Sequence, residues 1–136
     1  MIIKILSIAL LSFNLNLFHP DQPSVQIFDV KQEKVIQERP LTQELEKSII
    51  TLLQSSPTIH GGLSIDPKDG QILHVKFKNP VKLSSDIYPD LIKEVYLFLE
   101  HGVRPKALIF FNNTAKNIVV VLEGHSEQFI KKNILR

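Results

Sequence analysis

The chain has 136 residues, about the length of one domain, and its 43% apolar and 22% charged residues indicate a globular protein rather than a disordered one. Its formal net charge is +2 and no basic run exceeds Lys131-Lys132, so it lacks the cationic stripe of a nucleic-acid-binding protein. The absence of cysteine excludes disulfides, thiolate catalysis and zinc–cysteine sites, and it suits either an exported or a cytosolic protein.

The first twenty residues have the form of a secretion signal. Lys4 precedes an apolar run over residues 5–18, and this order is typical of a signal peptide. Asn14 and Asn16 interrupt the run before it reaches the ~18 apolar residues of a membrane span. We therefore expect residues 1–20 to be a signal peptide or an N-terminal membrane anchor.

Two further observations bear on this segment. No pair of small residues with the spacing of a cleavage site stands near residues 18–22. Phe13, Leu15 and Leu17 alternate with polar residues, which favours instead a half-buried strand that folds with the domain. The expected location is extracellular or at the cell surface, with membrane association through residues 2–18, and the alternative location is cytoplasmic.

The domain itself is expected over residues 24–136, after a proline-rich linker. Short apolar runs at 25–30 and 35–37 flank a polar turn, which predicts a β-hairpin. A helix follows, with Thr42 as its N-cap and with leucine and isoleucine side chains on one face. The proline at position 57 follows the end of this helix.

A second hairpin is predicted from residue 63 to residue 77. Leu63 and Ile65 precede the turn 66–70, and the following strand alternates apolar with polar residues. This alternation places His74 on the solvent-facing side of the strand. The stretch 63–75, LSIDPKDGQILHV, resembles the hairpin of PepSY-type domains, small secreted modules of a helix and a hairpin, although the predicted helices lack that family's alanine-rich pattern.

The rest of the chain predicts a second main helix and a third hairpin. Pro89 suits the first position of a helix over residues 88–101, and Gly102 suits the position after its end. Continuous apolar runs at 107–111 and 118–122 are typical of strands that are covered on both faces. Ser126 is expected to cap a short last helix.

These elements predict an α+β fold. We expect an antiparallel sheet of about six strands, made from three hairpins, with two main helices on one face. The alternative is a smaller α/β arrangement with parallel pairing around the central apolar strands.

No catalytic, cofactor-binding or metal site is predicted. The five histidines show no metal-binding spacing, and Asp66 and Asp69 lack the further oxygen ligands of a calcium loop. Gly61-Gly62 lacks the lysine of a phosphate-binding loop. If each predicted helix carries the chain to the other end of the sheet, His101 and His125 share one end and His60 lies at the opposite end.

We therefore expect a small exported or surface-anchored, non-enzymatic binding or regulatory domain. Its partner would be an unidentified protein or small molecule and not a nucleic acid. The alternative is a small cytosolic or membrane-associated enzyme whose active site is assembled from dispersed residues. Four residues would be its first candidates: His101, His125, Glu123 and Ser126.

Overall fold

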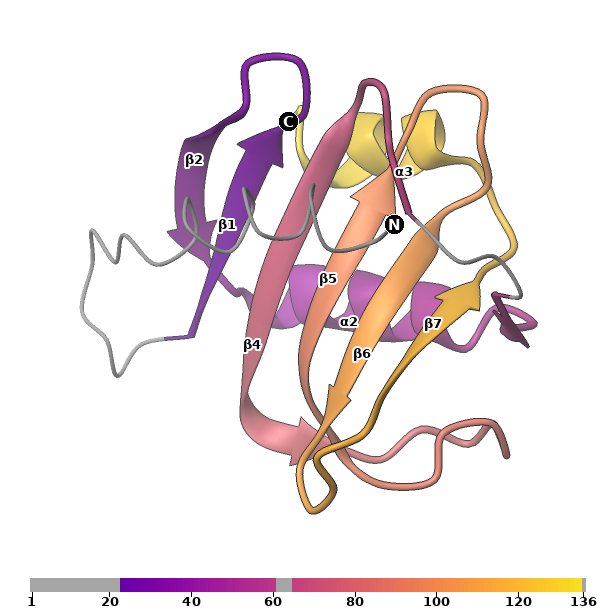
Figure 1. Ribbon diagram of the computed structural model, residues 1–136. Coiled ribbons are helices and arrows are strands. Elements are labelled where there is room, and N and C mark those ends of the chain that lie inside the picture. The colour runs from indigo at the N-terminus through magenta and orange to yellow at the C-terminus, as the bar shows by residue number, and fades with distance from the viewer. Residues whose placement is uncertain (1–22, 61–64, 136) are drawn as a thin grey trace.

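The computed structural model describes residues 23–60 and 65–135, so the signal-peptide or anchor segment expected at residues 1–20 lies outside the described residues. The described residues form one seven-stranded antiparallel sheet and two helices, which confirms the α+β prediction (Figure 1). The strand order is β2-β1-β4-β5-β6-β7-β3. The elements are β1 (Ser24–Asp29), β2 (Lys34–Pro40), α2 (Gln43–Leu53), β3 (Thr58–Ile59), β4 (Gln71–Val81), β5 (Ile92–Leu99), β6 (Lys106–Phe111), β7 (Asn117–Val121) and α3 (Ser126–Asn133).

Two of the three predicted hairpins are present. β1 pairs with β2, and β6 pairs with β7, both antiparallel. The β6–β7 turn is held in place by Asp90, which lies in the loop before β5. Asp90 accepts hydrogen bonds from the backbone N–H of Asn113 at 2.7 Å and from the side-chain amide of Asn113 at 3.0 Å. This turn is therefore fixed by a contact that is remote in sequence.

The first predicted helix is confirmed as α2. The hydroxyl of Thr42 accepts a hydrogen bond from the backbone N–H of Leu45 at 3.1 Å, which satisfies one of the free donors at the helix start. Leu45, Ile49 and Leu53 are buried against the sheet. The 3.6-residue period of these side chains is the reason that the sequence predicted this helix correctly.

The second predicted hairpin is wrong in its first strand. Ile65 is not part of any strand, and residues 63 and 64 lie outside the described residues. β4 exists, but it pairs with β1 on one side and with β5 on the other. The turn at 66–70 thus leads into a central strand instead of joining two neighbouring strands.

The predicted helix over residues 88–101 is also wrong, because this segment contains β5. From Val95 to Leu99 every side chain of β5 is buried, since the strand lies in the middle of the sheet and both of its faces are covered. A strand buried on both faces loses its two-residue alternation, and its leucines and valines can then match a helical period by chance. The second helix on the sheet is instead α3, which was predicted as a short last helix.

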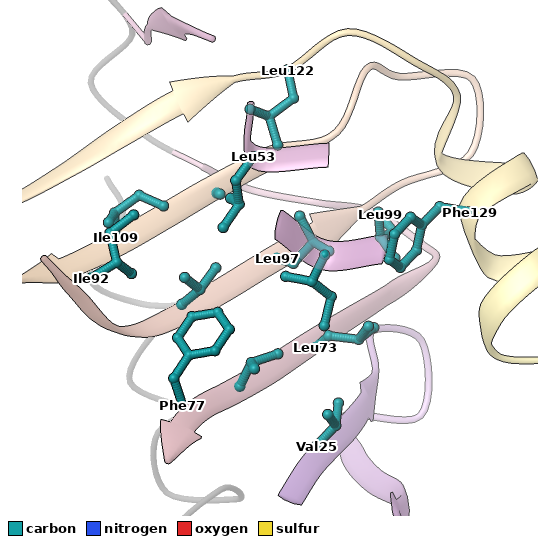
Figure 2. Close-up of a cluster of buried hydrophobic side chains, with 14 of the residues drawn as sticks. Val25, Leu53, Leu73, Phe77, Ile92, Leu97, Leu99, Ile109, Leu122 and Phe129 are labelled. Carbon is teal, nitrogen blue, oxygen red and sulfur yellow. The ribbon is translucent and has the colours of Figure 1, made fainter. Parts of the chain in front are cut away.

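Both helices lie on one face of the sheet, behind it in the view of Figure 1. The core between them and the sheet is shown in Figure 2, where Leu53 of α2 and Phe129 of α3 point toward strand residues such as Leu97. The opposite face, which we call the second face, carries another cluster of buried apolar side chains. This second-face cluster consists of Phe28, Val30, Ile65, Ile72, Tyr96, Phe98 and Leu108.

Both edge strands of the sheet are poorly suited to pair with a further strand. β2 is interrupted by a register shift opposite Ile27 and Phe28 and ends at Pro40, and β3 has only two residues. Short or bulged edge strands and proline hinder the addition of further strands from other molecules. Within residues 23–60 and 65–135, no helix is long and apolar enough to cross a membrane.

Candidate functional site

The four residues that sequence reasoning named as enzyme candidates lie near one another at the start of α3. The carboxylate of Glu127, on the first turn of α3, lies beside the imidazole of His101, and the charges of His101 and His125 both act on it. The distance from His101 Nδ1 to Glu127 Oε1 is 3.7 Å. The expectation that His101 and His125 share one end of the fold therefore agrees with the structure, although the helix used to derive it is a strand.

Glu127 is the residue at this end that sequence reasoning missed. It accepts a hydrogen bond from the backbone N–H of Gly102 and so ties α3 to the turn after β5. This bond is the main cause that lowers the pKa of Glu127. The backbone N–H of Glu127 itself and the charges of the two histidines lower the pKa further, and burial raises it by a smaller amount than the bond lowers it. The sequence signal was its place in the first turn of a helix, where a carboxylate is favourable.

Ser126 and Glu123 have structural contacts instead of a catalytic geometry. Ser126 is fully buried, and its hydroxyl donates a hydrogen bond to the carbonyl oxygen of Val103 at 2.8 Å. Glu123 forms an ion pair with Arg104 at 3.1 Å and is exposed. A nucleophilic serine needs an accessible hydroxyl beside a base, and the hydroxyl of Ser126 is directed to the backbone instead.

The remaining described histidines lie elsewhere. The backbone N–H of His60 donates to the carbonyl oxygen of Val119, which places His60 beside β7 at the β3 edge of the sheet. The expectation that His60 lies at the opposite end of the sheet is wrong, because Thr58 of β3 pairs with Val121 at the end of β7 that leads to His125, and His60 lies beside the middle of β7. Three strand spacings, roughly 14 Å, separate this edge from β5, so His60 and His101 do not meet. His19 lies outside the described residues. In the described part of the chain, no group of three or more histidine, aspartate or glutamate residues is arranged to hold a metal ion.

The turn at 66–70 is joined to the turn after β5. Asp69 accepts a hydrogen bond from the backbone N–H of His101 at 3.0 Å, and Glu100 accepts one from the backbone N–H of Lys68 at 3.1 Å. These two reciprocal bonds hold the entry of β4 beside the exit of β5. Asp69 therefore holds the turn that was predicted to close the second hairpin next to His101.

A cleft of about 290 Å³ opens beside these turns, and we call it the α3 cleft. Its lining combines polar residues, among them Asp29, Asp69 and His101, with the apolar residues Ile130 and Leu135. Leu135 is 70% exposed, which makes it the most exposed of the large apolar side chains in the described residues. The lining residues are Asp29, Lys31, Asp69, Gly70, Gln71, His101, Ile130 and Leu135.

The carboxylates of the α3 cleft have capacity left for a ligand. Asp29 accepts one hydrogen bond from the backbone N–H of Gln32 at 2.9 Å, and Asp69 accepts the bond from His101. A carboxylate can accept about four hydrogen bonds, so each group can still accept bonds from a ligand. Two aspartates and one lysine give the lining a formal charge of −1 when histidine is left out of the count (two negative groups and one positive group).

A second polar group lies on the second face, where His74 was expected to be solvent-facing. His74 is only 7% exposed, its ring stacks on Tyr96 with a centroid separation of 4.2 Å, and its Nε2 forms a hydrogen bond with Glu94. The neighbouring Gln26 is also buried, and its amide donates to Glu38 at 3.1 Å. We call Glu38, Gln26, His74, Tyr96 and Glu94 the polar row.

The prediction that His74 faces solvent is therefore wrong. The alternation of β4 did place it on the face opposite to Leu73 and Val75, but that face is covered as well. Alternation reports only which side chains share a face. Whether the polar-looking face meets water is decided by the rest of the fold.

Replacing Glu94 with glutamine is expected to lower the free energy of unfolding by about 2 kcal/mol at pH 6, because a partly buried, charge-assisted hydrogen bond is lost. Burial raises the pKa of Glu94, but the hydrogen bond and charge of His74, with the charges of Lys76 and Lys93, outweigh it and leave the pKa below its ordinary value. A depressed pKa stabilises the fold above the unfolded-state pKa, and this contribution is lost as the pH falls through the folded-state pKa.

Urea denaturation of both proteins at pH 6 and at pH 3 measures this effect. The difference between the wild type and Glu94→Gln should shrink at the lower pH, and an unchanged difference would contradict the charge-assisted hydrogen bond of Glu94. Glu123→Gln is the matched control, since its exposed ion pair with Arg104 is expected to contribute less than about 1 kcal/mol at either pH.

Comparison of the chain with protein-family models, with curated proteins and with solved structures gives no match.

Proposed function

We propose that residues 24–136 form a small non-enzymatic binding or regulatory domain of an exported or surface-anchored protein, and that its ligand site is the α3 cleft. The observation that supports this proposal is the composition of that cleft. It combines two carboxylates that retain accepting capacity with the exposed apolar side chain of Leu135. Concave sites lined by apolar side chains and a few convergent polar groups are typical of ligand binding.

The chemistry of the cleft favours a ligand with a protonated amine and a short apolar part. The formal charge of −1 suits one cationic group, with Asp29 and Asp69 as its acceptors. Ile130 and Leu135 would contact the apolar part. The volume of about 290 Å³ lies at the lower end of the range of small-molecule sites, which suits one amino-acid side chain or an amine of similar size.

Nuclear magnetic resonance of the ¹⁵N-labelled full chain tests this site. The probes are short alkyl amines and lysine-containing tripeptides, with the corresponding carboxylic acids as negative probes. Saturable shifts are expected at Asp29, Asp69, Gln71 and His101 for the amines and not for the acids. Asp29→Asn with Asp69→Asn should weaken binding at least about tenfold, because a charge-assisted hydrogen bond contributes more than about 1.4 kcal/mol.

A second cleft on the same chain supplies the control. It has a volume of about 200 Å³ and is lined by Arg39, Pro40, Thr42, Glu44, Leu45, Lys132 and Asn133. Glu44→Gln in this cleft should leave amine binding unchanged. Shifts that gather there, or that persist in the double asparagine variant, would contradict the assignment of the ligand site.

The export part of the proposal rests on the signal-like order of residues 1–20 and has a test of its own. The protein is isolated from the cells that naturally produce it, and its intact mass and the cell fraction in which it is found are measured. Loss of about twenty residues, or recovery with membranes, is expected from this segment order. A full-length product in the soluble cytosolic fraction would contradict export and anchoring without affecting the ligand site.

A further inference from the structure

The α3 cleft contains one side chain of a type that changes its charge near neutral pH. Among the lining residues His101 is a histidine, and the others are aspartate, lysine, glycine, glutamine, isoleucine and leucine. Histidine is the type among these that ordinarily gains a proton between about pH 8 and pH 5. The side chain of His101 is 58% exposed, so it exchanges protons freely with the solvent. A change of pH can therefore change the charge of the cleft at one known position.

The backbone of His101 is held on two sides. Its N–H donates to the carboxylate of Asp69 at 3.0 Å, and the N–H of the following residue, Gly102, donates to the carboxylate of Glu127. The first bond ties His101 to the turn before β4, and the second ties its turn to α3. Neither bond uses the imidazole, so both persist whether or not the ring is protonated. His101 therefore stays beside the cleft in both of its charge states.

The charged and titratable groups around His101 come from the end of β1 and the turn after it, the turn before β4, the turn after β5 and the N-terminal end of α3. They are Asp29, Lys31, Lys68, Asp69, Glu100, His125 and Glu127. Arg104, in the turn after β5, pairs with Glu123 instead.

Glu127 is the partner of a protonated His101. Its carboxylate lies 3.7 Å from Nδ1 of His101, so the protonated ring forms an ion pair with it. The hydrogen bond from the backbone N–H of Gly102 lowers the pKa of Glu127, which keeps this carboxylate charged whether His101 is neutral or protonated. Protonation of His101 therefore adds one positive charge beside the cleft.

This protonation removes two properties of the cleft that favour an amine. Asp29, Asp69 and Lys31 give the lining a formal charge of −1, and a protonated His101 brings it to zero (two negative and two positive groups). A neutral imidazole has one nitrogen that accepts a hydrogen bond, whereas a protonated imidazole has two donors and no acceptor. The protonated ring then competes with the ammonium group of a ligand for the same carboxylates. Both changes weaken the binding of a cation.

We propose that His101 makes amine binding in the α3 cleft depend on pH: the cleft holds its ligand when the ring is neutral and releases it when the ring is protonated. This inference rests on the proposed ligand site and adds the regulation of that site. Binding is tightest at the alkaline end of the range from about pH 8 to pH 5 and weakens as the pH falls through this range. By linkage, a bound amine opposes the protonation of His101 to the same degree.

The affinity for n-butylamine, measured at about pH 8 and at about pH 5.5, tests the proposal. The ammonium group of this probe stays protonated at both pH values, as that of lysine does, so only the protein changes its charge. Titrations of the ¹⁵N-labelled full chain at constant ionic strength give the two dissociation constants. We expect binding to be about threefold to fivefold weaker at the lower pH, which is the effect of one charge on another at a partly exposed site.

Two histidine variants assign the effect to its residue. In His101→Gln the ratio of the two dissociation constants should fall to about one, because a glutamine amide does not take up a proton in this range. The ratio is taken within the variant, so its affinity at either pH need not match that of the unchanged chain. His125→Gln is the matched control and should keep the full ratio, since His125 is exposed and lies outside the lining.

The imidazole signals of His101 give a second readout. In the unchanged chain at about pH 6.5, saturating n-butylamine should move these signals toward those of the neutral ring, because a bound amine opposes protonation. The same addition to Asp29→Asn with Asp69→Asn should leave the signals unchanged.

Three results would overturn this regulation and leave the ligand site in place. The first is equal affinity at the two pH values in the unchanged chain. The second is a ratio that persists in His101→Gln, because another group would then cause the pH dependence. The third is a ratio that disappears in His125→Gln as well, because the effect would then not belong to the cleft. Absence of n-butylamine binding at about pH 8 would contradict the ligand site itself, and this inference with it.

Discussion

Gly70→Ala is expected to lower the free energy of unfolding by about 4 kcal/mol, at the upper end of the range for single substitutions. Gly70 has φ +83°, and a Cβ atom there would lie 2.0 Å from the carbonyl oxygen of Leu99. The carbonyl oxygen of Gly70 also accepts a hydrogen bond from Val30 N–H at 3.1 Å. A methyl group would thus force apart the ends of three neighbouring strands, β1, β4 and β5.

Gly102→Ala separates the steric clash from the backbone strain. Gly102 has φ +74°, and nothing lies within 4 Å of the position of its Cβ, so only the cost of the left-handed conformation remains, about 1 kcal/mol. Urea denaturation of both variants measures the difference. Equal losses of stability would show that the close approach of β4 to β5 at Gly70 is not present in solution.

Phe28→Ala is expected to lower the free energy of unfolding by about 3–5 kcal/mol, the range for a fully buried phenylalanine. Phe28 lies in the second-face cluster and has no exposed surface. Phe111→Ala is the matched substitution on the face covered by the helices, where Phe111 is 1% exposed. Similar losses are expected because both side chains are surrounded on all sides.

Urea denaturation of the full-length variants tests this prediction. A loss near 1 kcal/mol for Phe28→Ala, with a large loss for Phe111→Ala, would indicate that the second face is open to water. Ile36→Ala supplies a surface reference, because Ile36 on the edge strand β2 is 41% exposed and its truncation should change stability by less than about 1 kcal/mol.

The candidate site could be predicted only in part. His101 and His125 were placed at one end of the fold by tracing the chain, and the structure brings both to Glu127. Asp29 and Asp69 of the α3 cleft were not singled out together, because forty residues separate them and their place in one cleft depends on β1 pairing with β4. The sequence shows which side chains can accept hydrogen bonds but not which turns meet.

The amino-acid sequence by itself determined the elements whose pattern is local. α2 follows from its N-cap and its helical period, the hairpins β1–β2 and β6–β7 follow from apolar runs around polar turns, and the antiparallel α+β class follows from these elements. Only the tertiary structure decided that the segment 88–101 contains β5 and that His74 is buried. Burial on both faces of a central strand removes the two-residue alternation by which a sequence marks a strand, and the cover of a sheet face comes from residues distant in the chain.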